Sequence, residues 1–534
     1  MRALSELNDR QRRALAVLVR EDRNVMILGE AGTGKSDMIA MGCRLYAERL
    51  LSAGRKRVGC KVVAPYGMAA SKIDGQTVDS IFPEAVSVTD ASTCRAMVAR
   101  MLARNPTSPR WTAVRALALL VIDEISTLTP TKLEMLDVFF RTVRRCPGLF
   151  MGGLRVMLCG DFLQLDPVGD ELAKLHEHEL LIRGEFKVVL LEDNLRQSDE
   201  ALRALLARSR IGKLTDEDRA TLATRRVEEP PRGRGALQVC YSRRRAFDIN
   251  DAELAAILDT ERVFVAIKRW TTNPSRGALE WTTSKVDAPH PSNLGPLGDR
   301  LREMCGRPNV QAVKRCALRV GARVMLNKNL YDHEDPRMRN GRLGTVRAIE
   351  VPEGCVHASH LVDEMVMLSA RTRVMVAFDD AGSPDAAVEV RPTVSRHSVR
   401  VAGALRRCEV WCMPLTLAWA VTVYKAQGCE LHSVVVHSDD LYKPKHLYVA
   451  LSRCRALEGL YLMGPPSELC CRADDRDLEL YDALQNNGGE WDYRQGMLTP
   501  RVSIGCEGAS NPTIASKRRR SNDGDRGKAA AERE

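Results

Sequence analysis

The chain has 534 residues and a formal net charge of +11, because 80 Lys and Arg outnumber 69 Asp and Glu. Its hydrophobic content of 44% is enough for a sizeable core, which excludes wholesale disorder, and its length allows roughly three or four domains. The apolar run over residues 116–122 is far shorter than the roughly 18 residues that a membrane helix needs. With no secretory leader pattern at the N-terminus, we expect neither a membrane protein nor a secreted one.

The first 195 residues alternate short apolar strands with helical stretches. Residues 131–145 carry apolar side chains on one helical face and predict an amphipathic helix. Expected strands lie at residues 24–28, 61–64, 117–123 and 154–160. The alternation predicts a parallel sheet covered by helices, the first of two α/β lobes.

A second α/β pattern begins after about residue 235, with expected strands at residues 237–241, 433–437 and 460–463. Within it, short alternating runs broken by Gly, Pro and Asp predict a small inserted β module. The polar, Gly-rich end of the chain predicts a disordered tail. The expected domains are a first lobe over 1–195, a second lobe over 196–344 and 402–485, a β insertion over 345–401, and a tail over 486–534.

A phosphate-binding motif follows the first expected strand. It fits G-x-x-x-x-G-K-[ST], with a helix-compatible stretch after it. Backbone N–H groups and the helix N-terminus would present positive charge to a phosphate, while Lys35 reaches the outer phosphates and Ser36 binds Mg2+. The nucleotide-binding candidates in this motif are Gly29, Glu30, Ala31, Gly32, Thr33, Gly34, Lys35 and Ser36.

Further polar residues stand where the strands of this lobe end. Asp123 and Glu124 close an apolar strand, so Asp123 is expected to bind Mg2+ and Glu124 to orient and deprotonate the attacking water. Gln164 follows the next strand and suits a sensor of the γ-phosphate, although a solvated turn residue fits as well. Arg196 and Arg453, among many arginines, are candidates to stabilise the charge on that phosphate.

The ordered set of motifs resembles the Pif-one/RecD-like DNA helicases, the 5′-to-3′ branch of superfamily one. With the phosphate loop and the acid pair included, at least six motifs occur in the family's order, and the matches span about residues 7–463, nearly the whole folded chain. The matching segments lie at residues 7–11, 63–70, 75–80, 152–153, 194–197, 210–212, 318–329, 340–346, 414–428 and 448–453.

The resemblance implies two RecA-like P-loop NTPase lobes with ATP between them and an SH3-like fold for the β insertion. Gln11 would recognise adenine and Gly428 would contact the nucleotide, while Arg196 and Arg453 would be arginine fingers. Residues 82–112 would hold a wedge that separates strands. The DNA-contacting residues that the resemblance implies are Pro65, Tyr66, Gly67, Thr77, Asn329, Thr422, Tyr424 and Lys425.

The activity implied by the resemblance is ATP-driven, Mg2+-dependent translocation 5′ to 3′ on single-stranded DNA. Its partners would be single-stranded and duplex DNA, and unwinding would serve replication, repair, recombination or telomere maintenance. We expect a monomer when free and no membrane partner. A non-catalytic DNA-binding scaffold and a small-molecule phosphotransferase are the alternatives. The first has no need of the full catalytic set, and the second has no need of a second lobe.

The sequence departs from the family at five positions. Asp79 would repel a DNA phosphate unless it faces a neighbouring Arg or Lys. Tyr66 and Tyr424 would either stack on bases or pack against neighbouring strands. The remaining departures are Asp166 in the sensor segment and Ala426 in the coupling motif.

Two further expectations concern the cysteines and the C-terminal tail. The 16 cysteines are scattered without C-x2-C spacing, so we expect free thiols, with structural zinc as the alternative. The basic stretch Lys517–Arg520 suggests nuclear import, although a solvated tail has the same composition.

Overall fold

The computed structural model describes residues 6–82, 90–168, 174–192, 199–231, 235–260, 262–265, 267–270, 316–330, 333, 338–353, 355–357, 364–368, 370–380, 386–401 and 404–498. All of these lie in one compact unit, Met1–Thr499. Arg196 and the basic stretch Lys517–Arg520 fall outside the described residues.

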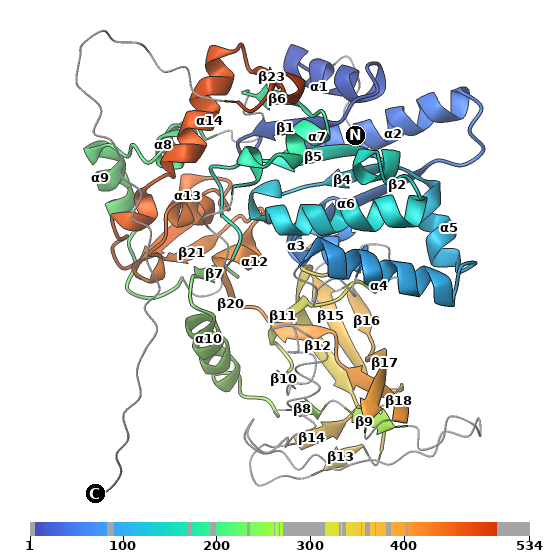
Figure 1. Ribbon diagram of the computed structural model, residues 1–534. Coiled ribbons are helices and arrows are strands. Elements are labelled where there is room, and N and C mark those ends of the chain that lie inside the picture. The colour runs from blue at the N-terminus through green and yellow to red at the C-terminus, as the bar shows by residue number, and fades with distance from the viewer. Residues whose placement is uncertain are drawn as a thin grey trace, which may run out of the picture. The chain divides into compact units, whose positions relative to one another are not determined.

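The first lobe is built on a seven-stranded sheet in the order β23-β6-β1-β5-β4-β2-β3 (Figure 1). All neighbouring pairs are parallel except β23 with β6. The strands are β1 Val25–Gly29, β2 Gly59–Ala64, β3 Gln76–Thr77, β4 Leu117–Ile122, β5 Arg155–Gly160, β6 Lys187–Leu191 and β23 Glu490–Asp492. The four strands predicted for this lobe are confirmed to within two residues at each end.

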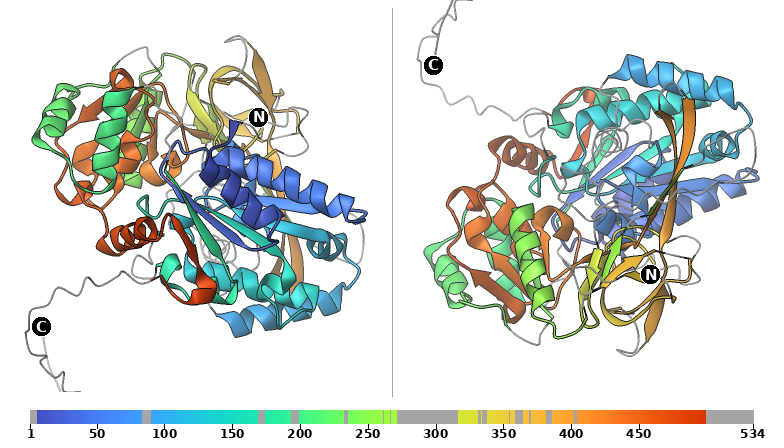
Figure 2. Two further views of the ribbon diagram at one scale, coloured as in Figure 1. Left: turned by 90° about the horizontal axis from the view of Figure 1, so that it is seen from above. Right: turned by 90° about the horizontal axis from the view of Figure 1, so that it is seen from below.

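Two hydrophobic layers cover this sheet, because successive strand side chains point to opposite faces. Val25 and Ile27 pack with α1 and α2, whereas Met26 and Leu28 pack with α6 on the other face. The helices accordingly lie on both faces of the sheet (Figure 2). The predicted amphipathic helix is α6. The helices of this lobe are α1 Asp9–Val19, α2 Lys35–Ser52, α3 Gly67–Lys72, α4 Ala91–Arg104, α5 Pro109–Ala116, α6 Pro130–Arg144 and α7 Leu180–Arg183.

The segment expected to hold a wedge, residues 82–112, contains α4 and the start of α5. Cys94 and Val98 on α4 are buried in the same core as Phe139 on α6. These helices are therefore packed against the lobe, and the strand-separating role stays a prediction.

The second lobe has a four-stranded parallel sheet in the order β20-β7-β21-β22. Its strands are β7 Leu237–Cys240, β20 Ala420–Thr422, β21 Val434–His437 and β22 Leu460–Met463. The helices around it are α8 Glu200–Arg210, α9 Asp216–Thr224, α10 Arg243–Ala255, α12 Val423–Ala426 and α13 His446–Leu451. Two parallel sheets, each with its own core, confirm the predicted pair of α/β lobes.

The β module is larger than the predicted 345–401. Its five-stranded antiparallel sheet, in the order β16-β15-β12-β11-β19, recruits strands from both sides of that range because β11 pairs with both β12 and β19. The module's strands are β8 Arg262–Val265, β9 Ile267–Trp270, β10 Cys316–Leu318, β11 Arg323–Leu326, β12 Leu343–Glu350, β13 Val356–His357, β14 Glu364–Met367, β15 Arg373–Phe378, β16 Ala387–Val390, β17 Thr393–Val401, β18 Ala404–Cys412 and β19 Leu415–Leu417.

The predicted boundary at residue 486 is wrong. Helix α14, Asp475–Asn486, places Leu484 in the core of the first lobe, and the following 3-10 helix, Tyr493–Gln495, buries Tyr493 there too. The polar strand β23 between them forms ion pairs with the first lobe. An Arg23 guanidinium nitrogen lies 2.7 Å from the Asp492 carboxylate, and the Arg13 Nε lies 3.2 Å from that of Glu490. Its sequence therefore looks like a tail although the strand completes the first sheet.

The described residues contain no helix that is both long and apolar enough to cross a membrane. Every cysteine for which the structure gives a state is a free thiol.

The place of α14 can be tested through stability. Leu484 is fully buried, so Leu484→Ala should lower the free energy of unfolding of the first lobe by about 2–5 kcal/mol, measured by urea denaturation. The exposed neighbour on the same helix supplies the control, and Glu479→Ala should change stability by less than about 0.5 kcal/mol. Equal, small effects of both substitutions would contradict the packing of α14 described above.

Candidate active site

The phosphate loop joins the buried strand β1 to the long helix α2. Gly32 and Gly34 adopt φ values of +100° and +84°, which disfavour side chains with a Cβ. A Cβ on Gly29 would lie only 2.8 Å from the Leu191 carbonyl oxygen. The Lys35 ammonium donates to the carbonyls of Gly29, at 2.7 Å, and Glu30, at 2.8 Å. The loop is therefore a preformed cradle at the N-terminus of α2.

Gln11 supports this loop from α1. Asn8 and Gln11 form a reciprocal capping box at the start of the helix, which fixes the Gln11 backbone. The buried Gln11 amide then donates to the Thr33 carbonyl at 3.1 Å. Gln11 thus contacts the phosphate loop directly, and its recognition of adenine stays a prediction.

The acid pair lies just past β4. The pKa of Asp123 is raised to about 7, mainly because the carboxyl is buried and secondly because the Glu124 carboxylate lies beside it. Oδ1 of Asp123 is buried and has no hydrogen-bond partner among the described residues. Glu124 adopts a left-handed backbone conformation with φ of 52°. Its carboxylate accepts a 3.0 Å hydrogen bond from the Gln427 amide of the second lobe.

Gln164 lies in the loop after β5 and is almost completely buried. Its Oε1 has no hydrogen-bond partner in the described part of the chain. Leaving a buried polar atom unpaired costs free energy, so such an atom at a cavity wall indicates a site shaped for a ligand.

Arg453 follows α13 in the second lobe and is only 3% exposed. Its Nε donates to the Val449 carbonyl at 2.8 Å, and one terminal nitrogen donates to the Ser452 hydroxyl at 2.7 Å. These bonds hold the guanidinium at the end of α13.

These groups surround one cavity of about 300 Å³. The first lobe supplies the phosphate loop, the acid pair and Gln164, and the second lobe supplies Gly428 and Arg453. Gly29, Glu30, Thr33 and Gln11 are not among the lining residues, which are Ala31, Gly32, Gly34, Lys35, Ser36, Asp37, Ala69, Lys72, Asp123, Glu124, Gln164, Gly428 and Arg453.

Lys72 and Gln427 are two residues that the sequence analysis did not assign. Lys72 on α3 adds a second ammonium to the cavity, and no sequence motif indicated it. Gln427 directly precedes Gly428, so its position in the coupling motif was a usable signal.

The donor set fits a hard divalent cation. The Ser36 hydroxyl and the Asp123 carboxylate line the same cavity, and oxygen ligands of this kind are what Mg2+ prefers. Asp123 Oδ1, which has no hydrogen-bond partner in the described part of the chain, could serve as a ligand atom.

The predicted DNA-contacting residues meet where the lobes approach one another. The rings of Tyr66 and Tyr424 lie edge to face, with centroids 6.3 Å apart, and Tyr424 contacts His446 in the same way at 5.9 Å. Burial raises the pKa of Tyr66 to about 12, against the opposing effect of Arg243. The two tyrosines thus contact one another across the lobes, and Arg243 is a basic neighbour that the motifs did not indicate.

The other predicted contact residues build the same region. A Cβ on Gly67 would clash with the Asn340 side chain unless that side chain moved, and the Asn329 side chain accepts from the Asn340 N–H at 2.7 Å. The Thr422 hydroxyl accepts from the Lys425 N–H at 3.4 Å. Pro65 and Thr77 follow β2 and end β3, respectively, on the same lobe as Tyr66.

Asp79 faces a lysine. The Lys132 ammonium, at the start of α6, forms an ion pair with the Asp79 carboxylate. Both side chains are about one-third exposed, 34% for Lys132 and 33% for Asp79. Of the two environments considered for this carboxylate, the structure therefore shows the paired one.

Comparisons with known proteins agree with this architecture. A family profile described as "PIF1-like helicase" matches residues 6–213. The ATP-dependent DNA helicase PIF7 of Trypanosoma brucei brucei is 27% identical over 484 residues, covering 86% of this chain and 46% of that protein. The ATP-dependent DNA helicase Pif1 of Bdellovibrio bacteriovorus is 27% identical, covering 86% of this chain and 88% of that protein.

The solved structures show the fold. Candida albicans Pif1 helicase has a TM-score of 0.68 at 23% identity and covers 90% of this chain and 99% of that one. Bacteroides Pif1 in complex with ADP-AlF3 and single-stranded DNA has a TM-score of 0.64 at 21% identity, with coverage of 91% and 99%. Among the curated relatives, this chain spans about half of the trypanosome protein and 64% of the human PIF1 helicase.

Fold and site together define a two-lobed P-loop NTPase, with RecA-like lobes that share one phosphate-binding cavity. The order of the motifs and the similarity across both lobes make the assignment more specific. The chain is similar to PIF1-like helicases, by the family profile over residues 6–213 and by Pif1 relatives at 27% identity that cover 86% of it.

The Asp79–Lys132 ion pair leads to a prediction about DNA affinity. In Asp79→Asn, Lys132 loses its partner and its charge becomes available to a phosphate. The affinity for single-stranded DNA should rise about threefold at low salt and show a steeper salt dependence. Fluorescence anisotropy with a labelled oligonucleotide measures both. Glu48→Gln, the same charge change on α2, is the control, and an equal gain in the two variants would contradict a local effect of Lys132.

Proposed function

We propose that this chain is an ATP-dependent DNA helicase that moves 5′ to 3′ along single-stranded DNA and unwinds duplex or structured DNA. The observation that carries the proposal is a cavity that both lobes line. It joins the phosphate loop and the acid pair of the first lobe to Gly428 and Arg453 of the second. The Bacteroides relative, solved with both ADP-AlF3 and single-stranded DNA, supports the same combination of ligands.

Hydrolysis follows from the groups in the cavity. Lys35 and the N–H groups of the phosphate loop bind the outer phosphates of ATP. Glu124, held by Gln427, orients the attacking water and accepts its proton. Arg453 and Gln164 stabilise the charge that spreads over the γ-phosphate oxygens as it is transferred. When bound at Ser36 and Asp123, Mg2+ supplies further neutralisation of phosphate charge.

Coupling to DNA runs through a short segment of the second lobe. Gln427 and Gly428 contact the acid pair and the cavity, and α12 immediately before them carries Tyr424 and Lys425. A change at the nucleotide therefore has only a few residues to cross before it reaches the DNA-contacting region. Opening and closing of the lobes then alternates their hold on the strand.

The two alternatives account for less of the structure. A scaffold that only binds DNA gives no reason for one cavity to hold buried oxygens of Gln164 and Asp123 that find no hydrogen-bond partner among the described residues. A small-molecule phosphotransferase gives no reason for a second lobe that contributes its own buried arginine. ATP hydrolysis that is stimulated by single-stranded DNA separates the helicase from both.

The arginine finger can be tested against a near neighbour. Arg453→Ala should retain ADP binding and reduce the DNA-stimulated kcat roughly 10³-fold, because a transition-state charge contact is lost. Arg455→Ala is the control, since Arg455 is half exposed and pairs with Glu430 at 3.3 Å. A kcat of Arg453→Ala close to that of Arg455→Ala would remove Arg453 from the mechanism.

The direction of movement has its own experiment. Strand displacement is measured on a duplex with a 5′ single-stranded tail and, separately, on one with a 3′ tail. We expect ATP-dependent unwinding of the first substrate only, with Lys35→Ala as the inactive control because the outer phosphates lose their ammonium. Unwinding that requires the 3′ tail would overturn the polarity.

A further inference from the structure

A buried lysine of the second lobe reaches into the first. Lys445 directly precedes α13, is 1% exposed, and adopts a left-handed backbone conformation with φ of 67°. Its ammonium donates to both oxygens of Asp166, at 2.9 and 2.8 Å, and to the Phe162 carbonyl at 3.1 Å. It also contacts the Asp477 carboxylate on α14. A second-lobe cation thus binds acceptors on the loop after β5 of the first lobe and on α14, whose Leu480, Tyr481 and Leu484 pack in the first-lobe core.

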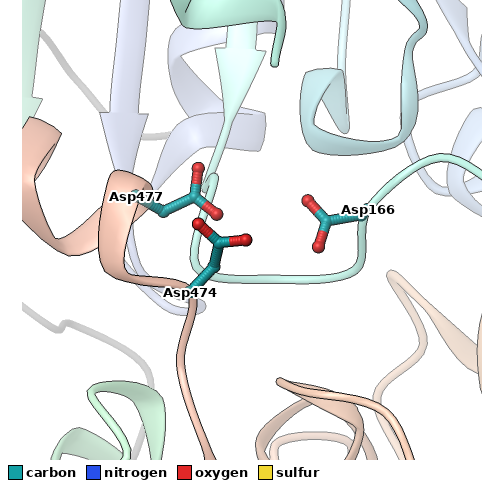
Figure 3. A group of neighbouring side chains, drawn as sticks. All are labelled: Asp166, Asp474 and Asp477. Atoms are coloured by element: carbon teal, nitrogen blue, oxygen red, sulfur yellow. The ribbon is translucent and has the colours of Figure 1, made fainter. Parts of the chain in front are cut away.

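The contacts around Lys445 belong to an ion cluster with two ammonium groups. The carboxylates of Asp166, Asp474 and Asp477 point toward a common centre (Figure 3). The Lys174 ammonium of the first lobe lies 2.8 Å from the Asp166 carboxylate, 3.1 Å from that of Asp474 and 2.7 Å from that of Asp477. Lys445 contacts Asp166 and Asp477, and His176 Nε2 lies 2.8 Å from Asp477 Oδ1, so basic side chains from several segments contact the three acids.

Gln164 lies in the loop over residues 161–166, here called the sensor loop. Three consecutive residues of this loop contact three different parts of the molecule. Gln164 lines the nucleotide cavity, Leu165 is buried in the core of the second lobe, and Asp166 binds Lys445. At the start of the same loop, Asp161 is held by both nitrogens of an Arg210 fork, at 3.0 and 2.8 Å, and by the Tyr481 hydroxyl at 2.7 Å. The sensor loop is therefore fixed at both ends.

The lysine and the arginine finger lie at opposite ends of one helix. Lys445 is the residue before α13, and Arg453 follows its last turn. Every residue of α13 is buried, and the Arg453 Nε is bonded to the Val449 carbonyl of that helix. A shift of the N-terminal end of α13 relative to the sensor loop would therefore move the guanidinium relative to Gln164.

We propose that Lys445 is a positioning residue that sets the distance between Gln164 and Arg453, so that both reach the γ-phosphate in the same closed state. The proposal rests on the proposed ATP hydrolysis and adds a residue to it that touches neither nucleotide nor DNA. Without the Lys445 contacts, the Gln164 and Arg453 side chains are still present, but they are no longer held at the distance from each other that the transition state requires.

The test compares a ground-state ligand with a transition-state analogue. The ligands are Mg2+-ADP and Mg2+-ADP with aluminium fluoride. The variant is Lys445→Met, which keeps an unbranched side chain one atom shorter and removes the charge. The affinity for ADP should stay within about twofold, because the phosphate loop is untouched, whereas the affinity for the analogue should fall at least about tenfold. The DNA-stimulated kcat should fall by a similar factor.

Lys174→Met is the matched control. It removes an equally buried ammonium from the same cluster, but this ammonium belongs to the first lobe and does not hold α13. We expect it to lower the unfolding temperature without a selective loss of analogue affinity. Should Lys445→Met fail to fold, Asp166→Asn carries the test, because Asp166 is 20% exposed and Lys445 keeps Asp477.

The outcomes separate the two levels of the account. Lack of ATP hydrolysis by the unmodified chain in the presence of single-stranded DNA would overturn the proposed function itself. With hydrolysis present, unchanged analogue affinity in the lysine variant, or equal losses for ADP and the analogue, would overturn the role of Lys445 alone. A loss of analogue affinity in Lys174→Met as large as that in Lys445→Met would also contradict it.

Discussion

The rest of the structure depends on one electrostatic arrangement, in which each of the two lobes contributes cationic groups to the same cavity. The first lobe offers the phosphate loop with Lys35, and the second offers the buried guanidinium of Arg453. A transferring phosphoryl group carries negative charge on several oxygens, and cations in a largely buried site stabilise it more strongly than cations in water. Under the proposed function, bound nucleotide would favour closure of the lobes and its hydrolysis would release them.

The cross-lobe contacts show how this chemistry is transmitted. Gln427 holds Glu124, Gly67 packs against Asn340, and Tyr66 meets Tyr424, so the cavity and the predicted DNA-contacting residues share one interface. The buried lysine before α13 adds a fourth contact at the other side of the sensor loop. Each contact joins residues that are far apart in the chain, and so each depends on how the lobes are placed.

The sequence was sufficient wherever the signal is local. The phosphate loop, the acid pair and Gln164 were predicted because a strand and a turn fix their positions within a few residues, and the lobe strands followed from apolar periodicity. Boundaries that depend on pairing were not predictable. Strand β11 belongs to the β module because it pairs with β12 and β19, and β23 belongs to the first sheet because ion pairs hold a polar strand there. Asp166 looked like a simple departure because its partner Lys445 lies 279 residues away.

A structure of the protein with Mg2+, ADP and aluminium fluoride tests the central claim most directly. The account predicts that the Arg453 guanidinium and the Gln164 amide both lie within hydrogen-bonding distance of the aluminium fluoride, with the acid pair on its other side. An Arg453 that stays bonded only to its own lobe, with no contact to the analogue, would contradict a nucleotide site shared by the two lobes.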